Sequence, residues 1–187
     1  MTAHPRLAEL DPAAFRSALR ELLEVYVQAM NYPPGTADAR APLWNEHSRR
    51  AGFRCVIACG DDGAVLAMAY GYQGRSGQWW YTEVARGLGP SGGWWLDDYF
   101  ELTELHVRPD CQGRGLGEAV LRLLLEPVTA GHVLLSTPEG ENRAWRLYRR
   151  VGFTDLLRGF LFTGDSRPFG VLGRSLPLDA PARSDQS

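Results

Sequence analysis

Six consecutive residues, Gln112-Gly113-Arg114-Gly115-Leu116-Gly117, form the segment of the chain best suited to binding phosphate. They lie between a predicted strand that ends at Val107 and a predicted helix over 117–125. Glycine allows positive φ angles and lets the backbone approach a ligand closely. The first turn of a helix adds unpaired N–H groups and a partial positive charge, and both favour an anion. The spacing therefore predicts a phosphate cradle at a strand–loop–helix junction.

Two common nucleotide-binding patterns do not fit this loop. A dinucleotide fingerprint, G-x-G-x-x-G, starting at Gly113 would need glycine where Glu118 stands. Starting at Gly115, it would need glycine at Val120. The Gly-Lys-Ser/Thr of a P-loop is absent as well. On these residues alone, a glycine-rich turn without a ligand stays open as the alternative.

The loop belongs to a larger pattern that resembles a known family. Gln112-x-x-Gly115-x-Gly117 is similar to the Gln/Arg-x-x-Gly-x-Gly/Ala signature of GNAT N-acetyltransferases. Residues 101–109, Glu-Leu-Thr-Glu-Leu-His-Val-Arg-Pro, resemble the family's fourth strand. Residues 142–153 resemble its second signature, an Asn-x-x-Ala-x-x-x-Tyr helix that ends in Gly-Phe. Both motifs stand in the family's order, so the close resemblance covers about residues 99–155.

The resemblance implies an N-acetyltransferase that passes acetyl directly from acetyl-CoA to an acceptor amine. It also implies which residues meet the coenzyme: the loop amides hold the pyrophosphate, and the strand end bonds the pantetheine arm through its backbone. Asn142 matches a coenzyme-contacting asparagine, although asparagine also suits a helix cap. The expected coenzyme residues are Leu105, His106, Val107, Gln112, Gly113, Arg114, Gly115, Leu116, Gly117 and Asn142.

Three further residues are candidates for the chemistry. An amine like that of lysine has a pKa of about 10.4 and must lose a proton before it attacks. By its place on the fourth strand, Glu101 is the first candidate for the base, and Glu104 is the reserve. Because the two glutamates stand three residues apart on a strand, their side chains are expected on opposite faces. For either one, the alternative is a solvated or ion-pairing strand residue. Tyr148 matches the family's proton donor to the leaving thiolate, and its place on the apolar face of the helix leaves a core role as the alternative.

The acceptor is a separate question. Asp97 and Asp98 stand beside Trp94 and Trp95, and carboxylates with aromatic faces suit a cationic amine. We therefore expect a small amine, such as a polyamine, an amino-sugar antibiotic or an amino-acid derivative. A protein N-terminus or lysine is one alternative, and a non-catalytic acyl-CoA-binding sensor or interaction module is another. Segment 73–97, with four of the six tryptophans, is expected either to cap a hairpin edge or to wall the acceptor cleft.

Hydrophobic periodicity predicts the elements that must position these residues. We expect one α/β (α+β) domain over 1–176, with a flexible tail at 177–187. Its sheet should be mixed but mostly antiparallel, with six to seven strands and helices on both faces. Helices are expected at 11–30, 41–51, 117–125 and 141–151, and strands at 53–59, 64–72, 100–107, 132–136, 153–162 and 169–176.

Composition limits the function classes. The chain of 187 residues is 44% hydrophobic and 22% charged with a net charge of −2, which argues against a nucleic-acid partner. Neither a membrane-spanning stretch nor a secretory pattern is present, so a cytoplasmic location is expected. Cys55, Cys59 and Cys111 are then reduced thiols, the first two in the core and Cys111 in a turn, and no spacing predicts a metal site. A homodimer is compatible with the family resemblance.

Overall fold

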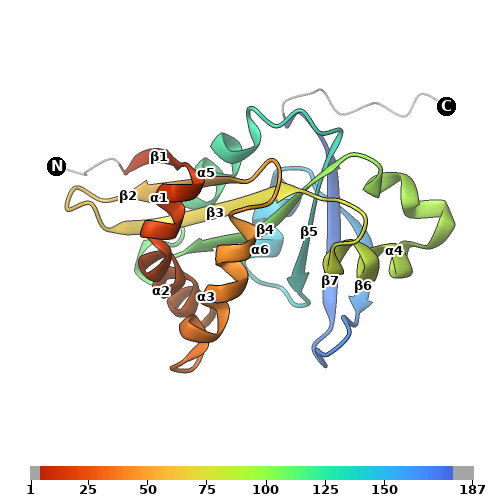
Figure 1. The fold of residues 1–187 in the computed structure, drawn as a ribbon, viewed down its shortest axis with the longest axis horizontal. Helices are drawn as coiled ribbons and strands as arrows, with labels where there is room; N and C mark the ends of the chain where they lie inside the picture. Colours follow the sequence, from red (N-terminus) through yellow and green to blue (C-terminus); the bar gives the residue numbers. More distant parts are fainter. Residues whose placement is uncertain (1–4, 179–187) are drawn as a thin grey trace.

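Seven strands form one sheet in the computed structural model of the chain, which describes residues 5–178. Their order across the sheet is β1-β2-β3-β4-β5-β7-β6 (Figure 1). The strands are β1 Arg6–Leu10, β2 Arg54–Cys59, β3 Val65–Gln73, β4 Tyr99–Val107, β5 His132–Pro138, β6 Thr154–Phe160 and β7 Phe169–Ser175. Only β4 and β5 are parallel; the other neighbours are antiparallel. This confirms the predicted mixed, mostly antiparallel sheet.

Six α-helices connect the strands within the described residues. They are α1 Pro12–Ser17, α2 Leu19–Met30, α3 Thr36–His47, α4 Trp79–Gly92, α5 Leu116–Leu125 and α6 Arg143–Arg150. The single helix predicted over 11–30 is interrupted at Ala18, which separates α1 from α2. Asp11 begins α1 as the sequence suggested, because its Oδ1 accepts a hydrogen bond from the N–H of Ala14 at 2.8 Å.

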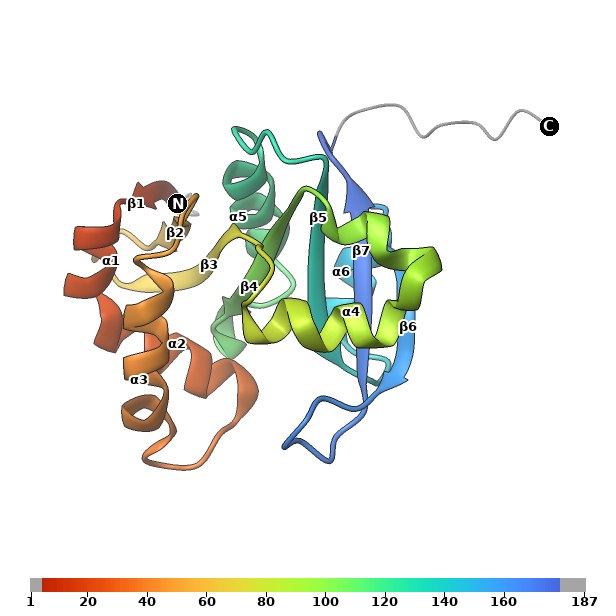
Figure 2. The same ribbon diagram turned by 45° about the vertical axis from the view of Figure 1, so that its right-hand side comes forward.

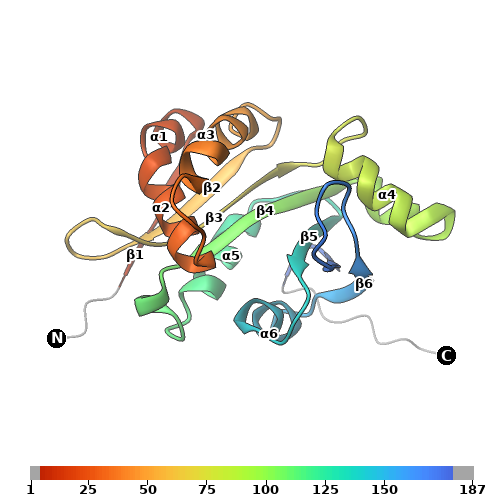
Figure 3. The same cartoon turned by 90° about the horizontal axis from the view of Figure 1, so that it is seen from below.

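The helices cover both faces of the sheet. In Figure 3, α1–α3 and α4 lie on one side, and α5 and α6 lie on the other. Buried side chains form one cluster under α1–α3, a second under α4, and a third between the sheet and α5 and α6. Cys55 and Cys59 are buried, as predicted for core thiols, and Cys111 lies in the short 3₁₀ turn Pro109–Cys111, where it is buried as well. The predicted tail lies almost entirely outside the described residues.

Two parts of the fold differ from the sequence prediction. Strand β1, a five-residue edge strand paired with β2, was not predicted. Segment 73–97 is mostly helical: α4 kinks at Gly89 and is followed by a 3₁₀ turn at Gly93–Leu96. Figure 2 shows α4 lying across β5 and β7, where Trp80 joins the buried cluster. Trp80 therefore has the core role that the sequence left open for these tryptophans.

No helix within residues 5–178 is long and apolar enough to cross a membrane.

Candidate active site

Strands β4 and β5 separate in the middle of the sheet. They pair in parallel only where Tyr99–Glu101 meets His132–Leu134. Past that point β5 continues to pair with β7, so Leu102–Val107 has no strand partner on its β5 side among the described residues. The separation leaves backbone N–H and C=O groups of β4 available to a ligand with amide groups of its own.

A cavity of about 910 Å³ lies at this separation. Its wall includes the end of β4 at Leu105, His106 and Val107, the glycine loop, the start of α6, and the end of α2 at Ala29 and Met30. The predicted coenzyme residues lie together here, with one exception: Arg114 is not part of the wall. The predicted catalytic residues Glu101, Glu104 and Tyr148 do not line the cavity either.

The glycine loop has the geometry of an anion cradle. Gly113 and Gly115 both have φ near +79°, a conformation that disfavours other residues. Gly115 is the N-cap of α5 and provides no side-chain cap, so the first N–H groups of the helix stay open toward the cavity. A Cβ added at Gly115 would meet no heavy atom within 4 Å. Gln112 donates from Nε2 to the Val107 carbonyl at 3.1 Å, which ties the loop to the strand.

Three arginines on α6 add positive charge to the wall of the cavity. Arg143, Arg146 and Arg150 all contribute to its wall, and their spacing puts them on one helix face. Arg143 reaches the loop, since its Nη1 would lie 3.2 Å from a Cβ on Gly113. Arg150 pairs with Glu118 at 3.0 Å. Sequence reasoning missed these residues, although three- and four-residue spacing of arginines in the second signature was a visible signal.

Asn142 is the N-cap of α6. Its Oδ1 accepts hydrogen bonds from the N–H groups of Ala144 at 3.0 Å and Trp145 at 3.2 Å. In this chain Asn142 also stands one residue closer to Ala144 than the signature Asn-x-x-Ala requires. Its cap role is therefore established, while contact with the coenzyme stays a prediction, supported by its place in the cavity wall.

Replacing Asn142 with alanine is expected to destabilise the protein by about 1 kcal/mol, because two N–H groups at the start of α6 lose their acceptor. Asn142→Asp keeps an acceptor oxygen and should stay within a few tenths of a kcal/mol of the wild type. Urea unfolding followed by circular dichroism measures both variants. Equal stability of Asn142→Ala and wild type would contradict the capping role.

The faces of Glu101 and Glu104 differ from the prediction. Glu101 pairs with Tyr72 and Glu104 with Tyr70, and the register shifts by one residue between these pairs. The extra residue is a β-bulge at Thr103, which restores the alternation of faces. Both carboxylates therefore lie on the face that carries Tyr70 and Tyr72. The expectation of opposite faces was wrong because a three-residue spacing across a bulge acts like a spacing of two.

Glu101 is a buried carboxylate with one free oxygen. Only 4% of the residue is exposed. Its Oε1 accepts a hydrogen bond from the Tyr72 hydroxyl at 3.0 Å, and Oε2 has no partner within residues 5–178. Burial raises the pKa of Glu101 to about 7, against the opposing effects of the Tyr72 hydrogen bond and the Arg50 cation. A carboxylate with this pKa can accept a proton near neutral pH.

Glu104 has a different environment. Its Oε2 lies 2.6 Å from Nε2 of His106, and the His106 ring contacts the ring of Tyr26 on α2. His106 thus faces neighbouring side chains on the α1–α3 side of the sheet. The contact with His106 engages one oxygen of Glu104, as Tyr72 engages one oxygen of Glu101, and the two carboxylates differ in the deeper burial and raised pKa of Glu101.

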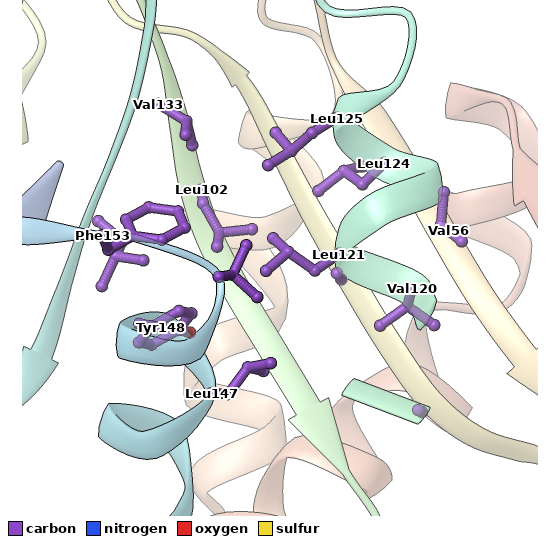
Figure 4. Close-up of a cluster of buried hydrophobic side chains, with 14 of the residues drawn as sticks. Val56, Leu102, Val120, Leu121, Leu124, Leu125, Val133, Leu147, Tyr148 and Phe153 are labelled. Atoms are coloured by element: carbon purple, nitrogen blue, oxygen red, sulfur yellow. The ribbon is translucent and has the colours of Figure 1, made fainter. Parts of the chain in front are cut away.

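Tyr148 lies at the end of α6, on the opposite side of the sheet from Tyr70 and Tyr72. It is 6% exposed and packs against Phe153, as Figure 4 shows. Burial raises the pKa of its hydroxyl, which stays protonated at neutral pH, and the negative charge of Glu104 adds to this effect. The residue is therefore part of the core and carries its proton at neutral pH, while its role as proton donor to the leaving thiolate stays a prediction. No group of histidine, cysteine, aspartate or glutamate side chains within residues 5–178 could hold a metal ion.

Comparison with known proteins decides the family. The model of the Acetyltransferase (GNAT) family matches residues 18–153. The chain belongs to this family. It is 48% identical to the GCN5-like protein acetyltransferase Rv2170 of Mycobacterium tuberculosis, over 92% of this chain and 98% of that protein.

Solved structures of GNAT proteins share the fold. Salmonella typhimurium yncA, solved with its cofactor acetyl-CoA, has a TM-score of 0.61 and 16% identity, covering 96% of this chain and 99% of its own. The ribosomal-protein-S18-alanine N-acetyltransferase of Escherichia coli has a TM-score of 0.60 and 17% identity, covering 92% and 94%. The protein is thus an acetyl-CoA-dependent acyltransferase with a single GNAT domain.

Proposed function

We propose that this GNAT protein transfers acetyl from acetyl-CoA to the side-chain amine of lysine in a protein acceptor, with Glu101 as the general base. The observation that carries the proposal is the buried carboxylate of Glu101, which has a free oxygen and a pKa of about 7. It lies where β4 and β5 begin to separate, on the strand whose far end lines the cavity.

The residues of the cavity fit the donor. The open N–H groups at the start of α5 suit the pyrophosphate, and Arg143 and Arg146 add positive charge on the opposite wall. The unpaired edge of β4 suits the amide groups of the pantetheine arm. Bound in this way, acetyl-CoA supplies a thioester carbonyl at the separation of the two strands.

The residues on β4 and α6 then move the protons. Glu101 takes a proton from the acceptor ammonium, and the resulting amine forms a C–N bond with the thioester carbonyl carbon. The C–S bond breaks as the tetrahedral centre collapses, and the thiolate takes a proton from the Tyr148 hydroxyl. The second proton of the attacking nitrogen passes to the resulting tyrosinate, directly or through water, which leaves a neutral amide and restores Tyr148, and Glu101 returns its proton to the solvent. A backbone N–H on the unpaired edge of β4 stabilises the oxyanion.

Two observations support a lysine acceptor. The relative from Mycobacterium tuberculosis is named a protein acetyltransferase, and its length and that of this chain correspond almost completely. Glu101 is buried, so an amine on a slender, unbranched stem suits it better than one next to a bulky group.

The small cationic amine of the sequence analysis is the second candidate. The aspartates and tryptophans that suggested it do not line the cavity, and most of them contact one another or their neighbours. Asp98 bonds Gln73 and the N–H of Gly131, and the rings of Trp94 and Trp95 stack on each other and contact His132. Glu101 and Glu104, on one face of β4, still provide negative charge that favours this class.

The chain contains no lysine, so it cannot itself become acetylated on lysine in a test of the acceptor. Any acetyl-lysine that forms with acetyl-CoA and a peptide therefore belongs to the peptide. We expect a lysine peptide to release coenzyme A thiol and gain one acetyl group, and its Lys→Arg counterpart to do neither. Turnover of polyamines or aminoglycosides alone would favour the second candidate. Binding of acetyl-CoA without turnover of any amine would favour a sensor.

A further inference from the structure

The Tyr72 hydroxyl connects Glu101 to a cation on another element. It lies 3.0 Å from Oε1 of Glu101 and 2.7 Å from Nη1 of Arg50, which follows α3. The Arg50 guanidinium also lies over the Tyr72 ring at 4.7 Å and bonds Oε1 of Glu46 at 3.0 Å. A chain of contacts thus runs from the buried Glu101 to Glu46, whose side chain is 63% exposed.

The chemistry of these groups fixes the direction of each hydrogen bond. Arginine only donates, so the Tyr72 oxygen must accept from Arg50. The single hydroxyl proton of Tyr72 is then left for Glu101, which as a carboxylate only accepts. Arg50 therefore orients the Tyr72 hydroxyl, and Tyr72 orients one oxygen of Glu101. The other oxygen, Oε2, is buried and has no partner among the described residues, so an acceptor amine that reaches it would meet an unsatisfied hydrogen-bond acceptor.

We propose that Tyr72 and Arg50 are positioning residues that keep Glu101 ionised and direct its free oxygen toward the acceptor amine. The inference rests on the proposed function, since it concerns the base of that reaction. Neither residue touches the reacting atoms; both act through the carboxylate. In a site this buried, a hydrogen bond from an oriented donor favours the charged form of Glu101 more than it would in water.

Other charged and titratable groups also act on Glu101. Arg50 favours its ionised form, and Glu104 on the same face of β4 opposes it. The hydroxyls of Tyr70 and Tyr99 are affected by its charge but form no hydrogen bond with it, and burial keeps both neutral. Tyr72 is therefore the one hydroxyl whose removal should change the ionisation of Glu101 directly.

Tyr72→Phe removes this hydroxyl and keeps the ring. Losing a hydrogen bond to a carboxylate should raise the pKa of Glu101 by about one unit. We expect kcat of the variant at saturating acceptor to be about one-tenth of the wild-type value below pH 6 and to approach it above pH 9. The ratio of the two rates at each pH is the measurement, because the titration of the acceptor cancels in it.

Tyr70→Phe is the matched control. Tyr70 lies two residues away on β3, is fully buried, and bonds Nδ1 of His47 at 3.0 Å instead of Glu101. Both variants lose a buried hydroxyl and a similar amount of stability, so circular dichroism should show similar thermal shifts. Only Tyr72→Phe should give a rate ratio that depends on pH.

Arg50→Gln is the second variant. It removes the cation and keeps the Tyr72 hydroxyl. Its rate ratio should change with pH in the same direction as that of Tyr72→Phe. If the ratio of variant to wild-type kcat does not depend on pH in either variant, the inference is overturned, and Tyr72 and Arg50 have only a structural role. If Glu101→Gln keeps full activity and the same pH profile, the proposed function fails first, so the two failures are distinguishable.

Discussion

Replacing Glu101 with glutamine is expected to lower kcat by about 10²–10⁴-fold, because an amide of nearly the same shape cannot take the proton from the acceptor ammonium. Glutamine still accepts the hydrogen bond of Tyr72, so the fold should be retained. Thiol release from acetyl-CoA at a saturating concentration of the lysine peptide measures kcat. Circular dichroism verifies that the variant is folded.

The pH profile gives the same prediction a second readout. Burial raises the pKa of Glu101 to about 7, so the fraction in the ionised, active form falls as pH drops below 7. The wild-type rate should therefore rise about tenfold per unit below pH 7 on account of Glu101, in addition to the effect of the acceptor's own titration. Glu101→Gln should lose this component and keep only that of the acceptor.

Glu104→Gln is the control that separates the two carboxylates. It removes the negative charge of the reserve base, whose Oε2 lies 2.6 Å from Nε2 of His106, and keeps an amide oxygen that can still accept a hydrogen bond there. We expect a loss of less than about tenfold, and a pH profile that still rises through the ionisation of Glu101. If the large loss occurs in Glu104→Gln and Glu101→Gln stays active, the assignment of the base is reversed.

The two carboxylates also show where sequence reasoning ends. The motif located both on one strand, and periodicity alone then put them on opposite faces. The β-bulge at Thr103 reverses that conclusion. A bulge depends on how a strand pairs with its neighbour, so the sequence of one strand does not reveal it. The same holds for Tyr72 and Arg50, which reach Glu101 only through the pairing of β3 with β4 and the packing of α3.

The strongly periodic parts of the fold were predictable for the opposite reason. In α5, Val120, Leu121 and Leu124 are fully buried, and their spacing alone predicts the helix. Strand β1 has no buried face, since three of its five residues are exposed and two are half-buried, and it pairs along the edge that β2 offers. The kink of α4 at Gly89 likewise depends on a positive φ that hydrophobic pattern does not encode.

Gly115→Glu, in the glycine loop, is expected to abolish acetyl-CoA binding, and this is the second prediction with a large effect. Gly115 is the N-cap of α5, and a Cβ there meets no atom within 4 Å, so the glutamate can extend into the space beside the loop. Its carboxylate would repel the pyrophosphate at the helix N-terminus. Isothermal titration calorimetry should show a loss of affinity on the order of 100-fold or more, equivalent to about 2.7 kcal/mol.

Gly35→Glu is a control with the same local strain. Gly35 also has a positive φ, is the N-cap of α3 without a side-chain cap, and a Cβ there also meets no atom within 4 Å. Both substitutions impose about 1–2 kcal/mol of left-handed backbone strain and add one negative charge. They differ in that Gly115 lines the cavity and Gly35 does not. Lost binding in Gly115→Glu together with wild-type affinity in Gly35→Glu would locate the pyrophosphate at the start of α5. Equal affinity in both variants would contradict this placement, because a carboxylate in the cradle could not leave a pyrophosphate there undisturbed.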